Sequence, residues 1–153
     1  MASKEDLLLQ KERKDLKLNP IEGAIFKWDD ANLRNFQVLI TGPEGSLYEG
    51  GEFEVEISIP SRYPKQAPRV VMKTPIIHPN IEKKTGAVCV ACLRVYHNSK
   101  VRIRTIVEEI IDALKNPNTK DPLDLAASQL FQEDFEQFKE QVQLQIAQNK
   151  LNQ

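Results

Sequence analysis

The sequence contains few of the residues that build metal sites and disulfide frameworks, and it has no excess of charge of either sign. Its 153 residues include two cysteines, two histidines and one tryptophan. Its 21 basic and 22 acidic residues give a formal net charge of -1, which provides no general electrostatic attraction for nucleic acids or anionic membranes. We therefore expect no nucleic-acid or membrane partner, and any protein partner must be recognised by a local surface.

Long apolar runs are also missing. No segment approaches the roughly 20 consecutive apolar residues that span a bilayer. The N-terminal segment MASKEDLLLQKERKDLK is charged throughout and is not organised as a signal peptide. We expect a soluble protein of the cytoplasm, the nucleus or both, and in such reducing compartments both cysteines are expected to be thiols.

The chain is long enough to fold without a metal or a disulfide. It is 41% hydrophobic and 28% charged, which is ordinary for a single domain with a substantial core. No repeat, linker or shift in composition divides it. Residues 1–153 are therefore predicted to form one domain, and nothing in the sequence requires more than a monomer.

The first part of the chain predicts one helix followed by strands. Ser3 is a suitable N-cap for a helix through about Lys17, and Asn19-Pro20 stops that helix. Strand candidates follow around residues 25–28 and 36–41. In EFEVEISIP, residues 52–60, apolar and polar side chains alternate, which is the period of a strand with one buried face. VVMK, residues 70–73, supplies a fourth short strand, so the pattern predicts an antiparallel meander.

After residue 100 the apolar period becomes that of a helix. Thr105 and Glu108 have the spacing of a capping box, and the apolar stripe that follows ends at Asn116-Pro117. Asp121-Pro122 has the pattern of an N-cap followed by a first helical residue. One last helix is predicted from five apolar residues at helical spacing: Phe131, Phe135, Phe138, Val142 and Ile146. Strands followed by helices predict an α+β fold: an N-terminal helix, a four-stranded antiparallel meander sheet, then C-terminal helices.

All the cysteines and histidines lie in one short stretch, between His78 and His97. As a zinc site, His78, Cys89, Cys92 and His97 supply four acceptable ligands, but their order and spacing match no familiar finger or knuckle. As a redox pair, a C-x-x-C motif usually begins a helix whose dipole lowers the pKa of the first thiol, whereas the next helix signal here is at Thr105. The small zinc-binding interaction domain remains an alternative, and the redox interpretation is weakened.

A third interpretation is one reactive thiol beside one packed thiol. An isolated cysteine is more often a buried apolar residue than a catalyst, and this is the role we expect for Cys92. Cys89 follows an irregular, proline-containing segment, which would put its thiol at the edge of the sheet beside the amide of Asn80. From the residues alone, the interpretations of this stretch stay open.

A series of short motifs is specific because of its order, although each motif alone is weak. The motifs are Gly42-Pro43, Tyr48-x-Gly50-Gly51-x-Phe53, Tyr63-Pro64 with Pro68, His78-Pro79-Asn80, Gly86-x-x-Cys89, Pro117-Asn118 and Asp121-Pro122-Leu123. Over about residues 5–147, the sequence resembles the ubiquitin-conjugating enzyme family.

This resemblance implies an acyltransferase that uses a thioester intermediate. Cys89 would accept ubiquitin, or a ubiquitin-like modifier, from an activating enzyme and transfer it to a substrate lysine or to the cysteine of a ligase. Asn80 would stabilise the oxyanion or hold the nearby loop, and Asp121 would orient the incoming amine. His78 would be a structural hydrogen bonder. The resemblance also implies a RING- or HECT-type ligase as partner, and no metal or organic cofactor.

The sequence departs from the family pattern at several positions. Ala91 stands where many members have aspartate, so slow direct transfer to lysine is expected. The EKKTG segment makes the chain from Asn80 to Cys89 one residue longer than the common pattern, and the loop is expected to absorb it. Lys65 and residues 96–99 replace the usual aromatic ligase contacts. These departures support an alternative, a non-catalytic variant of the family that acts as a binding module and in which Cys89 is vestigial.

Overall fold

A computed structural model, which describes residues 3–98 and 100–153, has the predicted N-terminal helix, four strands and C-terminal helices in that order, together with one short helix that was not predicted. Ser99, in the altered stretch 96–99, lies outside the described residues, as do the first two residues of the predicted domain. The elements are α1 (Lys4–Leu18), β1 (Ala24–Lys27), β2 (Asn35–Thr41), β3 (Glu52–Ser58), β4 (Arg69–Met72), α2 (Ala91–Arg94), α3 (Ile103–Lys115), α4 (Leu125–Glu133) and α5 (Phe135–Leu151).

The four strands form one sheet in the order β1-β2-β3-β4, and every neighbouring pair is antiparallel. The predicted α+β fold with a four-stranded meander is therefore confirmed. In the described part of the chain, no helix is long and apolar enough to cross a membrane.

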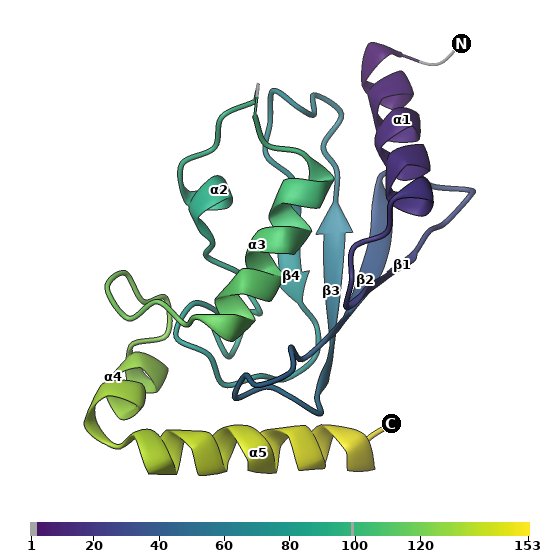
Figure 1. The fold of residues 1–153 in the computed structure, drawn as a ribbon. Helices are drawn as coiled ribbons and strands as arrows, with labels where there is room; N and C mark the ends of the chain where they lie inside the picture. Colours follow the sequence, from purple (N-terminus) through teal and green to yellow (C-terminus); the bar gives the residue numbers. More distant parts are fainter. Residues whose placement is uncertain (1–2, 99) are drawn as a thin grey trace.

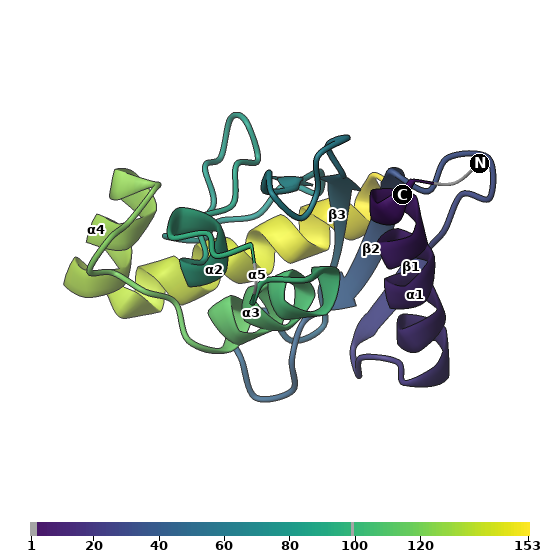
Figure 2. The same ribbon diagram turned by 90° about the horizontal axis from the view of Figure 1, so that it is seen from above.

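The core lies between one face of the sheet and α3. Alternation along β2 and β3 buries every second side chain, as the sequence predicts. Five residues of α3 are buried: Ile103, Ile106, Val107, Ile110 and Leu114. In Figure 1, α3 lies over the sheet and α5 runs across one end of it. Figure 2 shows α1 and α4 on opposite sides of α3.

The predicted start of α3 is wrong by three residues, because a capping box of Thr105 and Glu108 makes Thr105 the N-cap, whereas the N-cap is Arg102. The helix begins at Ile103, and Thr105 is its third residue, where its Oγ1 accepts a hydrogen bond from the Arg102 N–H at 3.2 Å. The Ile103 N–H donates to Glu12 Oε1 at 3.0 Å, so a carboxylate of α1 satisfies a free donor of the first turn. The pair Thr105 and Glu108 therefore does not form the predicted capping box.

The C-terminal helices also differ from the prediction. Asp121-Pro122 lies in a loop, and the N-cap of α4 is Asp124, whose Oδ1 accepts from the Ala127 N–H at 3.0 Å. The single last helix is in fact two helices, because Asp134 interrupts it. The Asp134 carboxylate accepts from the Gln137 N–H at 3.1 Å and so caps α5. Aspartate favours an N-cap over a helix interior because its short side chain bonds the free backbone donors.

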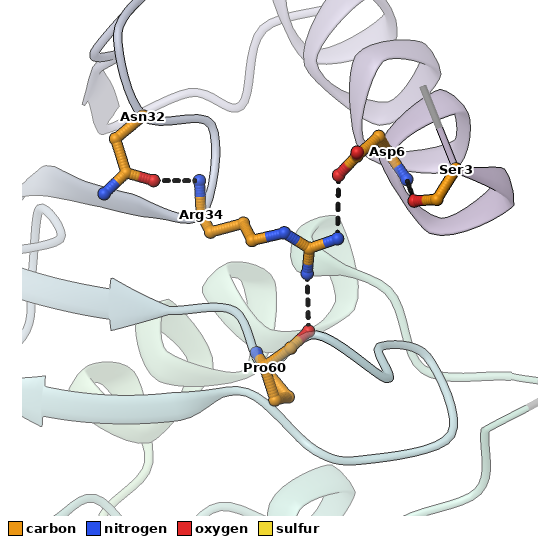
Figure 3. Close-up of polar contacts among 5 residues, drawn as sticks. All are labelled: Ser3, Asp6, Asn32, Arg34 and Pro60. Atoms are coloured by element: carbon orange, nitrogen blue, oxygen red, sulfur yellow. Dashed lines mark hydrogen bonds and ion pairs between the residues drawn. The ribbon is translucent and has the colours of Figure 1, made fainter. Parts of the chain in front are cut away.

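Arg34 connects three segments at the N-terminal end of α1 (Figure 3). Its guanidinium donates to the Pro60 carbonyl oxygen at 2.6 Å and to Asp6 Oδ1 at 2.7 Å. The Asp6 N–H donates to the Ser3 hydroxyl at 3.1 Å, which confirms Ser3 as the N-cap of α1. One arginine thus holds α1 against the loop that follows β3.

Replacing Arg34 by methionine is expected to lower the free energy of unfolding by about 1–2 kcal/mol, because the Pro60 carbonyl loses its charged donor. Urea unfolding of both proteins, followed by circular dichroism, measures this difference. Asp6→Asn is the matched control, since it removes only the charge of a partly exposed ion pair, and such pairs contribute little. Equal losses in the two variants would contradict the assignment of the main effect to the carbonyl bond.

Candidate active site

A short hairpin holds Asn80 and Cys89 opposite each other. Ile81 pairs with Val88 in an antiparallel bridge, and the Cys89 N–H donates to the Asn80 carbonyl oxygen at 2.9 Å. Gly86 closes the hairpin with a φ of 76°, and an added Cβ would collide with the Met72 carbonyl oxygen. The EKKTG segment forms the turn of this hairpin, and that the loop absorbs the additional residue stays a prediction.

The side chain of Asn80 is bound on both sides by a later segment of the chain. Its Nδ2 donates to the Asn118 carbonyl oxygen at 2.8 Å, and its Oδ1 accepts from the Asn118 N–H at 2.9 Å. The N–H groups of Leu123 and Asp124 both donate to the Pro79 carbonyl oxygen, at 2.8 and 3.0 Å. The segment from Pro79 to Asn80 therefore fixes the loop of residues 117–124 beside the hairpin of Cys89.

His78 is a structural residue, as the sequence predicts. It is fully buried, its Nδ1 accepts from the Asn80 N–H at 2.9 Å, and its Nε2 contacts the Ala113 carbonyl oxygen at 2.7 Å. Because Nδ1 accepts, Nε2 must carry the proton and donate it to that carbonyl. Burial lowers the pKa of His78 to about 4, so the neutral ring persists at neutral pH.

Asp121 lies on the fixed loop with an exposed side chain. Its Oδ2 accepts a hydrogen bond from Arg94 Nη1 at 3.1 Å. Arg94 is the last residue of α2, the short helix that begins two residues after Cys89. The structure thus brings the three predicted site residues, Asn80, Cys89 and Asp121, into one region through the contacts of Asn80 and Arg94.

The two cysteines have different surroundings. Both are free thiols, with Cys89 partly exposed and Cys92 buried. Cys92 lies on α2, and its N–H donates to Glu109 Oε1 at 2.9 Å. Burial, with a further contribution from the Glu109 charge, raises the pKa of the Cys92 thiol to about 12. Cys92 is therefore a packed, protonated thiol, and Cys89 is the accessible one.

The zinc and redox alternatives find little support in this geometry. Both ring nitrogens of His78 are engaged by the backbone, so neither is available for a metal. Within residues 3–98 and 100–153, no three His, Cys, Asp or Glu side chains are grouped to hold an ion. The prediction that no helix begins before Thr105 is wrong, because α2 begins at Ala91. However, the raised pKa of Cys92 disfavours thiolate exchange between the cysteines.

Two residues of the site were not identified from the sequence, Arg94 and Glu109. Each acts through a partner on another element: Arg94 through Asp121, and Glu109 through the backbone of Cys92. Helix α2 has only four residues and no side-chain cap, so no periodic or capping signal was available to predict it.

Comparison with known proteins agrees with the motif order. The sequence model of the family described as ubiquitin-conjugating enzyme matches residues 8–146. Ubiquitin-conjugating enzyme E2 13 of Saccharomyces cerevisiae is 42% identical over 113 residues, covering 74% of this chain and 73% of the yeast protein. Ubiquitin-conjugating enzyme E2 N of Macaca fascicularis is 39% identical over 113 residues and 74% of each chain.

A solved structure is similar over nearly the whole length. The crystal structure of a protein described as a ubiquitin conjugating enzyme from Plasmodium yoelii superimposes with a TM-score of 0.87 at 33% identity. The superposition covers 97% of this chain and 96% of that one. Sequence and structure comparisons therefore agree across both the sheet and the C-terminal helices.

Proposed function

Because the chain belongs to the ubiquitin-conjugating enzyme family, a family of transferases, we propose that Cys89 carries ubiquitin as a thioester. The observation that carries this proposal is the contrast between the thiols. Cys89 is partly exposed and lies opposite Asn80, whereas Cys92 is buried with a pKa raised to about 12.

The proposed chemistry has two acyl transfers. The Cys89 thiolate attacks the ubiquitin thioester carried by the activating enzyme, so a new sulfur–carbon bond forms and the activating enzyme's thiolate leaves. The product is again a thioester, and it remains reactive enough for attack by a substrate lysine or a ligase cysteine. The family as a whole works with ubiquitin, activating enzymes and ligases, and the particular partners of this chain are part of the proposal.

Asn80 is proposed to act mainly by holding the site together. Its Oδ1 and one Nδ2 hydrogen are already used by the backbone of Asn118. An oxyanion would have to be bound by the second Nδ2 hydrogen, with the first bond to Asn118 kept. The two bonds to Asn118 therefore support the role in which Asn80 holds the loop of residues 117–124.

Asp121 is proposed to orient an incoming lysine. A lysine amine with a pKa of about 10.4 must lose its proton before attack, which costs about 4–5 kcal/mol at pH 7. The Asp121 carboxylate can stabilise the positive charge that develops on the attacking nitrogen. Ala91 offers no second carboxylate, so slow direct transfer to lysine remains our prediction.

The ligase surface is proposed to include two loops that touch each other. The Tyr96 hydroxyl donates to the Pro64 carbonyl oxygen at 2.6 Å, which links the loop after β3 to the loop after α2. Lys65, the next residue, is exposed. A lysine in place of an aromatic anchor suits a RING- or HECT-type ligase whose contact surface has an acidic group at this point. A monomer in the cytoplasm or nucleus completes the proposal.

Incubation with activating enzyme, ATP and ubiquitin tests the thioester directly. On a non-reducing gel, the unmodified protein and Cys92→Ala should form an adduct that thiol reductant removes. Cys89→Ala should form none, because the nucleophile is missing. Cys92→Ala is the matched control, since it removes the neighbouring thiol. Failure of the unmodified protein to form an adduct with ubiquitin or any related modifier would favour the non-catalytic binding module.

A further inference from the structure

We propose that Arg94 is a positioning residue that biases the charged enzyme toward thiol acceptors and against lysine acceptors. This inference rests on the proposed function of Cys89, and it adds a preference for the class of acceptor. The observation that carries it is the ion pair in which Arg94 Nη1 donates to Asp121 Oδ2 at 3.1 Å. Arg94 is five residues along the chain from Cys89.

The backbone near Asp121 does not need this ion pair. The loop is already fixed on one side by Asn118, through Asn80, and on the other by Leu123 and Asp124, through Pro79. The Asp121 side chain itself is 72% exposed, so its direction is decided by what it binds. The bond from Arg94 therefore orients this carboxylate and places a positive charge beside it.

Few other charges compete for the same position. The Asp124 carboxylate uses its Oδ1 to cap α4, and helix α2, with the sequence ACLR, contains no acidic residue. Lys120, beside Asp121 in the chain, adds positive charge to the loop. Ala91, in particular, contributes no carboxylate that could replace the one paired with Arg94.

The two kinds of acceptor develop different charges. The thioester oxygen becomes negative in both attacks, but an attacking amine also develops a positive charge on its nitrogen, which the Asp121 carboxylate stabilises and a guanidinium paired with that carboxylate opposes. An attacking thiolate develops no positive charge, so a guanidinium in this region does not oppose its attack and favours the negative charge. An arginine that neutralises Asp121 thus favours the cysteine of a ligase over the lysine of a substrate.

The test measures discharge of the preformed Cys89–ubiquitin thioester to free lysine and to free cysteine. Relative to the unmodified protein, Arg94→Gln is expected to accelerate discharge to lysine roughly threefold to tenfold and to slow discharge to cysteine by a similar factor, typical of one partly exposed charge. Arg94→Lys should restore most of the original ratio. In the double variant with Asp121→Asn, the gain toward lysine should disappear.

Arg104→Gln is the matched control, because Arg104 also donates to an aspartate, Asp15, at 3.1 Å, but lies at the start of α3. It should change neither rate of discharge. Equal changes toward lysine and cysteine in Arg94→Gln would show a merely structural role and overturn the inference, as would no change at all. If no thioester forms in the unmodified protein, the proposed function itself has failed.

Discussion

Replacing Gly42 by alanine is expected to lower the free energy of unfolding by about 3 kcal/mol or more, the upper range for overpacking a tight site. An added Cβ would lie well under 3.0 Å from the carbonyl oxygen of Tyr48. That oxygen belongs to the backbone and cannot turn away. The Gly42 N–H is also fixed, because it donates to the Gly51 carbonyl oxygen at 2.8 Å.

Gly45→Ala is the control for this experiment. Gly45 has a φ of +80°, but a Cβ there would meet nothing within 4 Å. Its cost should therefore be only that of a left-handed backbone, about 1–2 kcal/mol. Chemical unfolding of the two variants compares the free-energy cost of a steric collision, in Gly42→Ala, with the cost of backbone strain, in Gly45→Ala. Stabilities that fall equally would contradict the close approach between Gly42 and Tyr48.

The effect of Gly42 should extend to the active site through Tyr48. The Tyr48 hydroxyl donates to the Ile77 carbonyl oxygen at 2.5 Å, and its ring lies 5.3 Å from the ring of His78, centroid to centroid. Displacing Tyr48 would therefore disturb the segment that ends in Asn80. A Gly42→Ala protein that still folds at low temperature should form the Cys89 thioester more slowly.

The second large effect is a loss of stability in mild acid that originates at His78. The pKa of His78 is lowered from 6.5 to about 4 in the folded protein because burial disfavours the charged ring. Between these two values, the unfolded chain binds a proton that the folded protein does not. Stability attributable to His78 is therefore full above pH 6.5 and decreases as the pH falls toward 4, by about 3 kcal/mol in total.

Three carboxyl groups with shifted pKa values either oppose the loss of stability caused by His78 or act at lower pH. The pKa of Glu12 is raised, mainly by burial, so its protonation stabilises the folded protein as the pH falls. The pKa values of Asp6 and Asp15 are lowered, chiefly by hydrogen bonds from Arg34 and Arg104. Their contribution is present above the ordinary aspartate pKa and is lost only in stronger acid.

Two measurements isolate the contribution of His78. Urea unfolding at a series of pH values should show a steeper fall between pH 6.5 and 4 for the unmodified protein and His97→Gln than for His78→Gln. Titration of the His78 ring by NMR needs no variant. A His78 ring that becomes protonated near pH 6.5 would contradict the buried, doubly bonded arrangement.

Features of the fold with a local period were predictable from the sequence, and features that depend on distant partners were not. Alternation over residues 52–60 gave a strand close to β3, and the hydroxyl of Ser3 marked the start of α1. The start of α3 was missed because its first donor is satisfied by Glu12, on another helix. The break at Asp134 was missed because Phe131 and Phe135 keep helical spacing across it.

In the candidate site, too, local motifs were predictable from the sequence and contacts between distant segments were not. The order of motifs placed Asn80 and Cys89 together, and the hairpin explains why they meet. No sequence pattern could indicate that Asn80 would bind the backbone of Asn118, or that Arg94 would reach Asp121, because each contact joins segments brought together only by folding. The roles proposed for Asn80, Cys89 and Asp121 in catalysis remain predictions.

In the hairpin before the thiol, the length of the turn does not determine the positions of Asn80 and Cys89. Cross-strand contacts at Ile81–Val88 and at Asn80–Cys89 act as rungs, and Glu82 and Gly86 are hydrogen-bonded beyond them. Residues added among the exposed residues 83–85 would lengthen the tip and leave these contacts unchanged. One residue added between Val88 and Cys89 would instead reverse which side of the ladder the thiol faces. The tip is therefore where a peptide tag could be inserted close to Cys89 without moving its sulfur.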